Sequence, residues 1–266
     1  MARRPSAWRR RTRSDLLSTG FKDHFSGQAA SYSAFRPTYP PRLFEWLAQT
    51  APRRDRVWDV GTGSGQAAGG LAELFTRIVG TDASAAQIAQ AAPHPRVEYR
   101  VAPAEASGLP AAWVDLVTVA QALHWFDLPK FFNEARRVLA PDGLLAVWCY
   151  GDPRLEDPAI DRIVHRYNRG TVEEYWPPER DLVLSEYRTI AFPFREISTP
   201  SLMLEAAWTL PQLGGYLRSW SSTARYAKVL GRDPVTTVEE ALGAVWNSPE
   251  TPRTIRWPIT IRAGHP

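Results

Sequence analysis

One stretch constrains the fold of this 266-residue chain more than any other. Residues 57–66 read VWDVGTGSGQ, a short apolar run that contains an acid and passes directly into three alternating glycines. An Ala- and Leu-rich segment, residues 67–75, follows with helical composition. Strand, glycine turn and helix in this order predict a ligand-binding turn of a doubly wound α/β sheet, because glycine permits the tight bend and the close approach of backbone to a ligand.

The glycine spacing distinguishes two kinds of nucleotide site. Gln66 stands where a dinucleotide-binding turn has its third glycine, so the G-x-G-x-x-G pattern is incomplete. The sequence D-V-G-T-G-S-G resembles motif I of the class I S-adenosylmethionine-dependent methyltransferases. This resemblance implies S-adenosylmethionine as cofactor, contacted by Asp59, Gly61 and Gly63. The glycines taken alone also fit a flexible loop.

A second acid lies at the expected distance. Residues 77–82 predict the second strand, and Asp82 ends it. A carboxylate at this strand tip binds the ribose hydroxyls of a nucleotide in folds of this kind. The alternative is that Asp82 caps the next helix, but Ser84 is an equally good capping residue.

The third strand, residues 97–101, precedes the pair Ala104-Glu105. In the family that the glycine turn resembles, such a pair borders the adenine. The resemblance implies that Ala104 offers its backbone and that Glu105 reaches the exocyclic amine. The alternative is an ordinary polar loop.

The fourth strand, residues 114–120, is a near-continuous apolar run, as a buried parallel strand requires. It is followed by the phrase AQALHWF, which matches motif IV of the methyltransferase type 11 group. Ligands bind outside the carboxyl ends of such strands, so Gln121, His124 and Trp125 are placed at the cofactor and acceptor cleft. His124 is the candidate catalytic base, with a near-neutral pKa. The alternative is a histidine that only fixes the loop or touches the cofactor.

The aromatic segment 21–41 ends in prolines and sharpens the resemblance. It is similar to the N-terminal segment of type 11 methyltransferases close to the trans-aconitate methyltransferase-like proteins, where such a segment covers the cofactor cleft. Tyr32, Arg36 and Tyr39 are therefore candidate substrate-binding residues. The alternative is that aromatic residues of this segment only pack it onto the core.

The remaining elements complete a class prediction. Residues 128–139 predict a helix and 144–150 a fifth strand, after which the βα alternation stops. Strand 6 is predicted at residues 195–199, followed by helices at 210–229 and 235–246. Residues 253–262 alternate at period two and contain Pro258, which favours an antiparallel edge strand. We expect an α/β fold with a doubly wound, seven-stranded, mostly parallel sheet whose last strand is antiparallel, together with a helical cap.

This expectation divides the chain into four parts. They are a disordered basic tail (1–20), a cofactor-binding core (21–150), strand 6 with a helical substrate cap (151–250) and the final edge strand (251–266).

Composition excludes several functions. The net charge of +4 comes from six arginines in residues 1–13, without which 26 basic residues face 28 acidic ones. The chain therefore has no basic face for nucleic acid, and no apolar run is long enough to cross a membrane. Cys149 is the single cysteine, which excludes an internal disulfide and a cysteine-based metal site. We expect no metal, a cytoplasmic location, and a monomer or homodimer.

The sequence thus favours transfer of a methyl group from S-adenosylmethionine to a small-molecule acceptor in a capped apolar cleft. The acceptor atom is left open between oxygen and nitrogen. A carboxylate acceptor needs only a cation, for which Arg36 is the candidate, whereas a phenol or amine needs a base such as His124. Two alternatives are a cofactor-binding protein without transferase activity and a nicotinamide-dependent oxidoreductase, which Gln66 and the Ala104-Glu105 pair disfavour.

Overall fold

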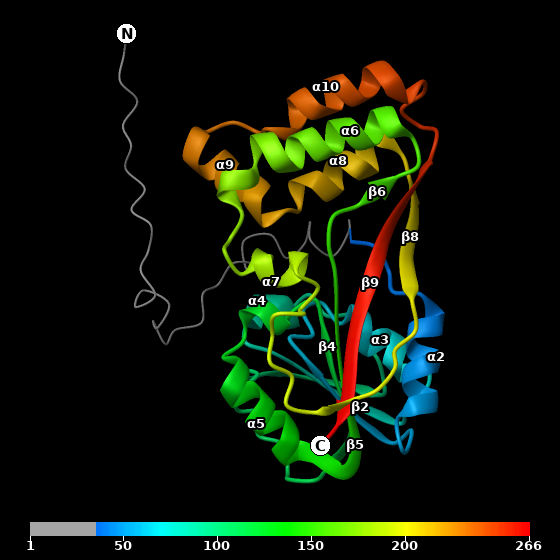
Figure 1. Ribbon diagram of the computed structural model, residues 1–266, viewed down its shortest axis with the longest axis vertical. Coiled ribbons are helices and arrows are strands. Elements are labelled where there is room, and N and C mark those ends of the chain that lie inside the picture. Colours follow the sequence, from blue (N-terminus) through cyan, green and yellow to red (C-terminus); the bar gives the residue numbers. More distant parts are fainter. Residues whose placement is uncertain (1–35) are drawn as a thin grey trace.

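The computed structural model describes residues 36–266, so the tail 1–20 and most of the predicted cleft-covering segment lie outside the described residues. A mixed sheet forms one end of the molecule, and helices α6, α8, α9 and α10 gather at the other end (Figure 1). The helices are α2 (Pro41–Thr50), α3 (Gln66–Ala72), α4 (Ala85–Ile88), α5 (Leu128–Val138), α6 (Pro158–Arg166), α7 (Arg180–Leu184), α8 (Leu210–Arg218), α9 (Ser221–Leu230) and α10 (Val235–Trp246). Short helical turns are η2 (Leu123–Trp125), η3 (Tyr167–Thr171) and η4 (Glu173–Tyr175).

The strands are β1 (Arg56–Val60), β2 (Arg77–Asp82), β3 (Val97–Val101), β4 (Val114–Ala120), β5 (Leu139–Tyr150), β6 (Arg154–Leu155), β7 (Arg195–Glu196), β8 (Leu202–Trp208) and β9 (Arg253–His265). Their order is β3-β2-β1-β4-β5-β9-β6, with β7 and β8 paired to β9. Strands β1 to β5 run parallel, and β9 runs antiparallel to β5. The predicted doubly wound, mostly parallel sheet is therefore confirmed.

The two faces of the sheet bury alternate residues of each strand. On β5, Trp148 packs on the face covered by α2 and α3, whereas Val147 and Cys149 pack on the face covered by α5. Strands β1 and β4 are buried almost throughout, as central parallel strands require. Because all five parallel strands end at one edge, the loops after β1, β2, β3 and β4 meet there.

Helices α6, α8 and α10 form a cap whose apolar core is continuous with one face of the sheet. Strand β9 runs from the cap into the sheet, and β8 runs alongside it (Figure 1). The cap helices begin with strong capping residues: Asp157 accepts from the backbone of α6, and Thr209 forms a capping box with Gln212 on α8. In the described residues the chain passes between the sheet and these helices at β5–β6, between α6 and β7, at β8 and at β9.

Several details differ from the sequence expectation. Strand β9 is not the edge, because β8 covers its free side and Met203 stands opposite Pro258. Strand 6 is reduced to the two residues of β7, and the predicted helix 210–229 is split between α8 and α9. The period-two pattern of β9 reports that its two faces differ, which holds equally for an interior strand next to a cap. In the described part of the chain no helix is both long and apolar enough to span a membrane.

Candidate active site

The glycine turn after β1 has a backbone conformation that favours glycine at three positions. Gly61, Gly63 and Gly65 all adopt positive φ, which side chains other than glycine adopt only with strain. A Cβ on Gly61 would stand 2.6 Å from the Cβ of Ala122, whereas the nearest atom to a Cβ on Gly63 would be Gln87 Oε1 at 3.8 Å. Gly61 therefore allows close packing onto the β4 loop, whereas a Cβ on Gly63 would make only an ordinary contact with Gln87.

Asp59 lies beneath the turn and is completely buried. Its carboxylate accepts hydrogen bonds from Thr62 Oγ1 at 2.6 Å and Thr118 Oγ1 at 2.7 Å. Burial raises the pKa of Asp59 to about 6, against the opposing effect of these hydrogen bonds. The predicted direct contact with a cofactor is thus corrected: Asp59 fixes the turn from within the core.

Asp82 ends β2 and joins the turn to the next helix. Its Oδ2 accepts from the Gly63 backbone N–H at 2.9 Å, and its Oδ1 accepts from the Ser84 N–H at 2.8 Å. Ser84 caps α4 as expected, since its side chain accepts from Gln87 N. Asp82 is half-buried at the end of β2, beside the backbone of the turn, and its ribose role stays a prediction.

Gln87 is a residue that sequence reasoning missed. It lies on the buried side of α4, and its Oε1 is a buried oxygen without a hydrogen-bond partner among the described residues. A buried carbonyl oxygen without a partner is costly, so its place beside the open side of Gly63 fits a ligand that carries hydrogen-bond donors. The hydroxyl and amino groups of S-adenosylmethionine are donors of this kind, so the site residues fit this cofactor.

The third strand end supplies Ala104 and Glu105. Ala104 is buried in the apolar cluster on the α5 face. Glu105 is half-buried, and its Oε1 accepts from the Asp127 backbone N–H at 2.8 Å. Glu105 therefore connects the β3 and β4 loops, and its second oxygen is the one left for the predicted adenine contact.

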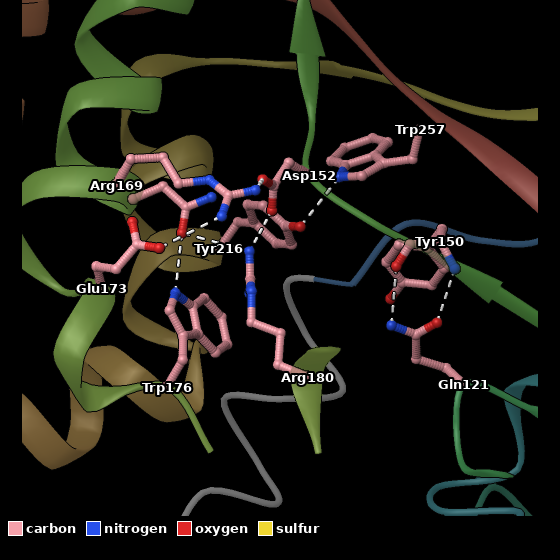
Figure 2. Close-up of polar contacts among 10 residues, drawn as sticks. Gln121, Tyr150, Asp152, Arg169, Glu173, Trp176, Arg180, Tyr216 and Trp257 are labelled. Carbon is pink, nitrogen blue, oxygen red and sulfur yellow. Dashed lines mark hydrogen bonds and ion pairs between the residues drawn. The ribbon is translucent and has the colours of Figure 1, made fainter. Parts of the chain in front are cut away.

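The fourth strand end supplies Gln121, which adopts a positive φ of 54°. Its side-chain amide forms a two-bond pair with the backbone of Tyr150: Nε2 donates to the carbonyl at 3.0 Å, and Oε1 accepts from the N–H at 2.8 Å (Figure 2). Gln121 thus fixes the end of β5 to the end of β4. It lines the pocket beyond these strands while its polar atoms are already paired.

His124 and Trp125 lie in η2, directly after Gln121. The two rings are 4.6 Å apart at their centroids, and both line the pocket. His124 Nδ1 is 2.9 Å from the hydroxyl of Tyr187. Burial lowers the pKa of His124 to about 3, so the predicted near-neutral pKa is wrong. A neutral imidazole of such low basicity is a poor general base.

The pocket itself lies between the strand ends and the cap, with a volume of about 80 Å³. Its core side is formed by Gln121, His124, Trp125 and Tyr150, and its cap side by Trp176, Arg180, Tyr216 and Trp220. A second cavity of about 310 Å³ shares the residues 151–153 and 183–184 as lining. Aromatic rings thus line the pocket both beside the strand ends and on the opposite side.

Arg180 is the buried charged residue on the side of the pocket opposite the strand ends, and no sequence motif pointed to it. Its side chain is only 14% exposed and forms an ion pair with Asp152. The guanidinium lies over the ring of Trp176 at 3.5 Å, and Trp176 in turn donates to Asn168 at 2.9 Å (Figure 2). Burial lowers the pKa of Arg180, which means that Asp152 does not fully offset the cost of burying this charge.

Asp152 is shared between two arginines. Arg169 approaches its other oxygen at 3.0 Å and also pairs with Glu173 at 3.4 Å (Figure 2). Arg36 brings a further cation to the pocket: it donates to the Ser219 carbonyl at 3.3 Å and lies over the ring of Tyr216. The arginines near the pocket therefore outnumber the carboxylates.

The other predicted substrate-binding residues have different outcomes. Tyr39 packs edge-on against Trp148 at 5.6 Å and against Phe44 at 6.4 Å. This is the packing alternative, and Tyr39 is not among the residues that line the pocket. Tyr32 lies outside the described residues.

The fold and the four converging strand ends define the class as an S-adenosylmethionine-dependent methyltransferase with a Rossmann-like sheet. A family model described as a methyltransferase domain matches residues 58–147. A protein from Dictyostelium discoideum named as a methyltransferase is 36% identical over 227 residues, covering 84% of this chain and 86% of that protein. The chain belongs to this methyltransferase family.

Two further similarities agree with this assignment. A crystal structure from Anaeromyxobacter dehalogenans, described as a type II methyltransferase, is 48% identical with a TM-score of 0.81, covering 87% of this chain and 98% of that chain. A Saccharomyces cerevisiae protein named as an S-adenosylmethionine-dependent methyltransferase is 25% identical, covering 76% of this chain and 81% of that protein. The cofactor is S-adenosylmethionine, and the protein is an enzyme.

Proposed function

We propose that this methyltransferase methylates the carboxylate of a small aromatic or unsaturated acid bound between the strand ends and the cap. The observation that carries the proposal is Arg180, buried in the pocket wall against Trp176 and only partly balanced by Asp152. An acid with a flat apolar body matches both the excess positive charge and the aromatic lining. The closeness to the trans-aconitate methyltransferase-like proteins stays a prediction.

The bound cofactor supplies an electrophilic methyl group on a sulfonium: the acceptor oxygen forms the new C–O bond, the C–S bond breaks, and the sulfur keeps its electron pair. No proton has to leave a carboxylate, so this reaction needs no base. The chain instead positions the reacting groups and excludes water from them. Arg180 and Arg36 hold the charged group, and the rings of Trp176 and Trp220 exclude water beside it.

We propose that the backbone of the glycine turn and a few side chains bind the cofactor. Asp82 would bind the ribose hydroxyls, Gly61 and Gly63 would let the backbone approach, and Gln87 would accept a hydrogen bond at its buried oxygen. Ala104 and Glu105 would border the adenine. Gln121 would act by holding Tyr150, whereas Trp125 would contact the ligand as part of the wall.

The test measures first the binding of an acid and then turnover. With S-adenosylhomocysteine bound, cinnamate is titrated against the tryptophan fluorescence of the pocket, in wild type and in Arg180→Met. Because a charge-assisted hydrogen bond contributes about 1.5–3 kcal/mol, Arg180→Met should weaken cinnamate binding by about 10- to 100-fold. Cinnamamide, which lacks the charge, should bind weakly to both proteins.

Turnover is read as release of S-adenosylhomocysteine with benzoate, cinnamate and trans-aconitate, and with matched phenols and amines. Turnover of phenols or amines but of no acid would contradict the carboxylate proposal and would favour N-methylation or phenol O-methylation. Equal cinnamate affinity in wild type and Arg180→Met would contradict the role of Arg180. Arg169→Met is the matched control: the Arg169 side chain is 37% exposed and pairs with the same Asp152 without lining the pocket, so this variant should change cinnamate affinity less.

A further inference from the structure

His124 and Tyr187 form a buried polar pair at the pocket wall. The hydroxyl of Tyr187 is 2.9 Å from His124 Nδ1, and Tyr187 is 1% exposed. Tyr187 and its neighbour Glu186 both adopt positive φ, of 57° and 56°. Two consecutive residues in this conformation cost roughly 1–2 kcal/mol each, so the packing of the chain enforces the position of this ring.

Arg262, on strand β9, hydrogen-bonds to the backbone of Tyr187. Its NH1 donates to the Tyr187 carbonyl at 2.8 Å and to the Ile190 carbonyl at 2.7 Å. The Arg262 guanidinium also pairs with Glu196 at 2.7 Å, so it is itself fixed. The backbone of Tyr187 is therefore held from strand β9, and the burial of its ring keeps the hydroxyl beside His124.

The hydrogen-bond partners determine which nitrogen of His124 carries the proton. The hydroxyl of Tyr187 is buried, and a buried O–H needs a hydrogen-bond acceptor. Its own proton is then donated to His124 Nδ1, the acceptor that the described residues place within reach. A neutral imidazole with Nδ1 as acceptor carries its proton on Nε2.

Nε2 is the ring nitrogen of His124 that does not face the hydroxyl of Tyr187. His124 lines the pocket, and no residue in the described range 36–266 forms a hydrogen bond with Nε2. Nε2 is also not among the buried atoms that lack a partner within this range. A directed N–H donor is thus presented next to Trp125 and Tyr150.

We propose that His124 is a hydrogen-bond donor, which presents Nε2–H to the oxygen of the acceptor that is not methylated, and that Tyr187 is the positioning residue that enforces this tautomer. The inference rests on the proposed function, because it concerns the acceptor of the same pocket. It specifies the acceptor further: the group opposite His124 must accept a hydrogen bond. A carboxylate does so at either oxygen, whereas an ammonium group has only N–H donors and cannot accept this hydrogen bond.

The first test compares two amides at position 124, with cinnamate as the probe and S-adenosylhomocysteine bound. The amide nitrogen of glutamine reaches the place of Nε2, and that of asparagine reaches only the place of Nδ1. His124→Gln should keep cinnamate affinity within about 3-fold, whereas His124→Asn should lose about 10- to 100-fold, since the lost bond is made to a charged group. Equal losses in both variants, or no loss in either, would overturn the donor role.

The second test reads the tautomer directly by 15N NMR of histidine-labelled protein, with the His124→Gln spectrum used for assignment. In wild type Nδ1 should be unprotonated and Nε2 protonated at neutral pH, with no titration of His124 near its ordinary pKa. Tyr187→Phe should shift the signals towards a mixture of tautomers while leaving S-adenosylhomocysteine affinity unchanged. A proton on Nδ1 in wild type would overturn the inference even if Tyr187→Phe does not fold.

The two proposals fail separately. The NMR experiment needs neither an acceptor nor turnover, so an enzyme that methylates no acid can still show the Nε2–H tautomer. In that case the carboxylate proposal is wrong and the positioning role of Tyr187 stands. If the enzyme methylates acids but His124 carries its proton on Nδ1, the carboxylate proposal stands and the positioning role of Tyr187 is wrong.

Discussion

The glycine turn and the cap pocket solve the problem of burying charge in opposite ways. At the turn, Asp59 is completely buried beneath two threonine hydroxyls, and Asp82 bonds to two backbone N–H groups. In the cap, Arg180 is buried against an aromatic ring and one shared carboxylate. The turn is thus built from neighbours in sequence and adjacent strand ends, while the cap pocket is built from segments that lie far apart along the chain.

The difference separates the residues proposed to bind the cofactor from the residues proposed to bind the acceptor. The polar groups of the turn are satisfied mostly by backbone and by each other, which suits a fixed cofactor. The cap pocket keeps excess positive charge against flat rings, which suits a variable anionic acceptor. Variants at the two ends should therefore separate cofactor binding from acceptor binding.

The largest effect is expected at the cofactor end. Asp82→Ala removes a charged acceptor for the ribose hydroxyls and frees the Gly63 N–H, so S-adenosylhomocysteine affinity should fall by about a thousand-fold. Isothermal titration calorimetry measures it. Arg180→Met, at the acceptor end, should leave this affinity within about 3-fold because none of its contacts is with the turn. Comparable losses in both variants would show that the two ends are not separate.

A second pair of variants tests the buried titrating groups, first at the turn. The pKa of Asp59 is raised to about 6 in the folded state, against an ordinary value of 3.8. Its contribution to stability is therefore complete below pH 3.8 and is lost as the pH rises through about 6. The stability of wild type relative to Asp59→Asn should fall by about 3 kcal/mol over this window.

His124 should show the opposite sign. Its folded pKa is lowered to about 3, below the ordinary value of 6.5, so its contribution is complete above pH 6.5 and is lost as the pH falls. Between about pH 6.5 and pH 4.5 wild type should lose about 3 kcal/mol relative to His124→Gln. Urea unfolding at a series of pH values measures both differences. The same sign for the two variants would contradict the assigned burial effects.

The smallest expected effects separate two glycines of one turn. Gly61→Ala adds a Cβ at 2.6 Å from Ala122 Cβ and forces a non-glycine residue to positive φ, so it should destabilise the fold by about 3 kcal/mol. Gly63→Ala adds a Cβ that makes only an ordinary contact with Gln87 Oε1 at 3.8 Å, so it should cost only about 1–2 kcal/mol for its φ. Gly63→Ala should instead weaken S-adenosylhomocysteine binding. Thermal unfolding and calorimetry distinguish them, and equal destabilisation would contradict the packing argument.

Much of the sheet could be predicted because its signals are local. Strands β2, β3 and β4 have the predicted bounds. The clearest signal is that of β4, since a buried parallel strand reads as a short apolar run between turns. The edge position predicted for β9 was wrong for a physical reason. An alternating pattern shows that the two faces of a strand differ, but it does not show whether another strand pairs with it.

The site was predictable in position more than in role. The turn, Asp82 and the loop of His124 were predicted to lie together because ligands gather at the ends of parallel strands, and the structure brings them together at that edge. The sequence could not show that Asp59 faces inward or that burial makes His124 a weak base. Arg180, Gln87 and Tyr187 gave no motif, because their roles depend on what packs against them.

The sequence by itself determined the cofactor fold: the glycine turn, the acid after β2 and the apolar strands are each contained in a few neighbouring residues. Only the tertiary structure decided how the acceptor pocket is charged and which proton it presents. Arg180 meets Asp152, and Tyr187 meets His124, across separations of 28 and 63 residues. Burial and pairing of this kind set charge and tautomer through the surrounding dielectric and hydrogen-bond partners, which exist only once the chain has folded.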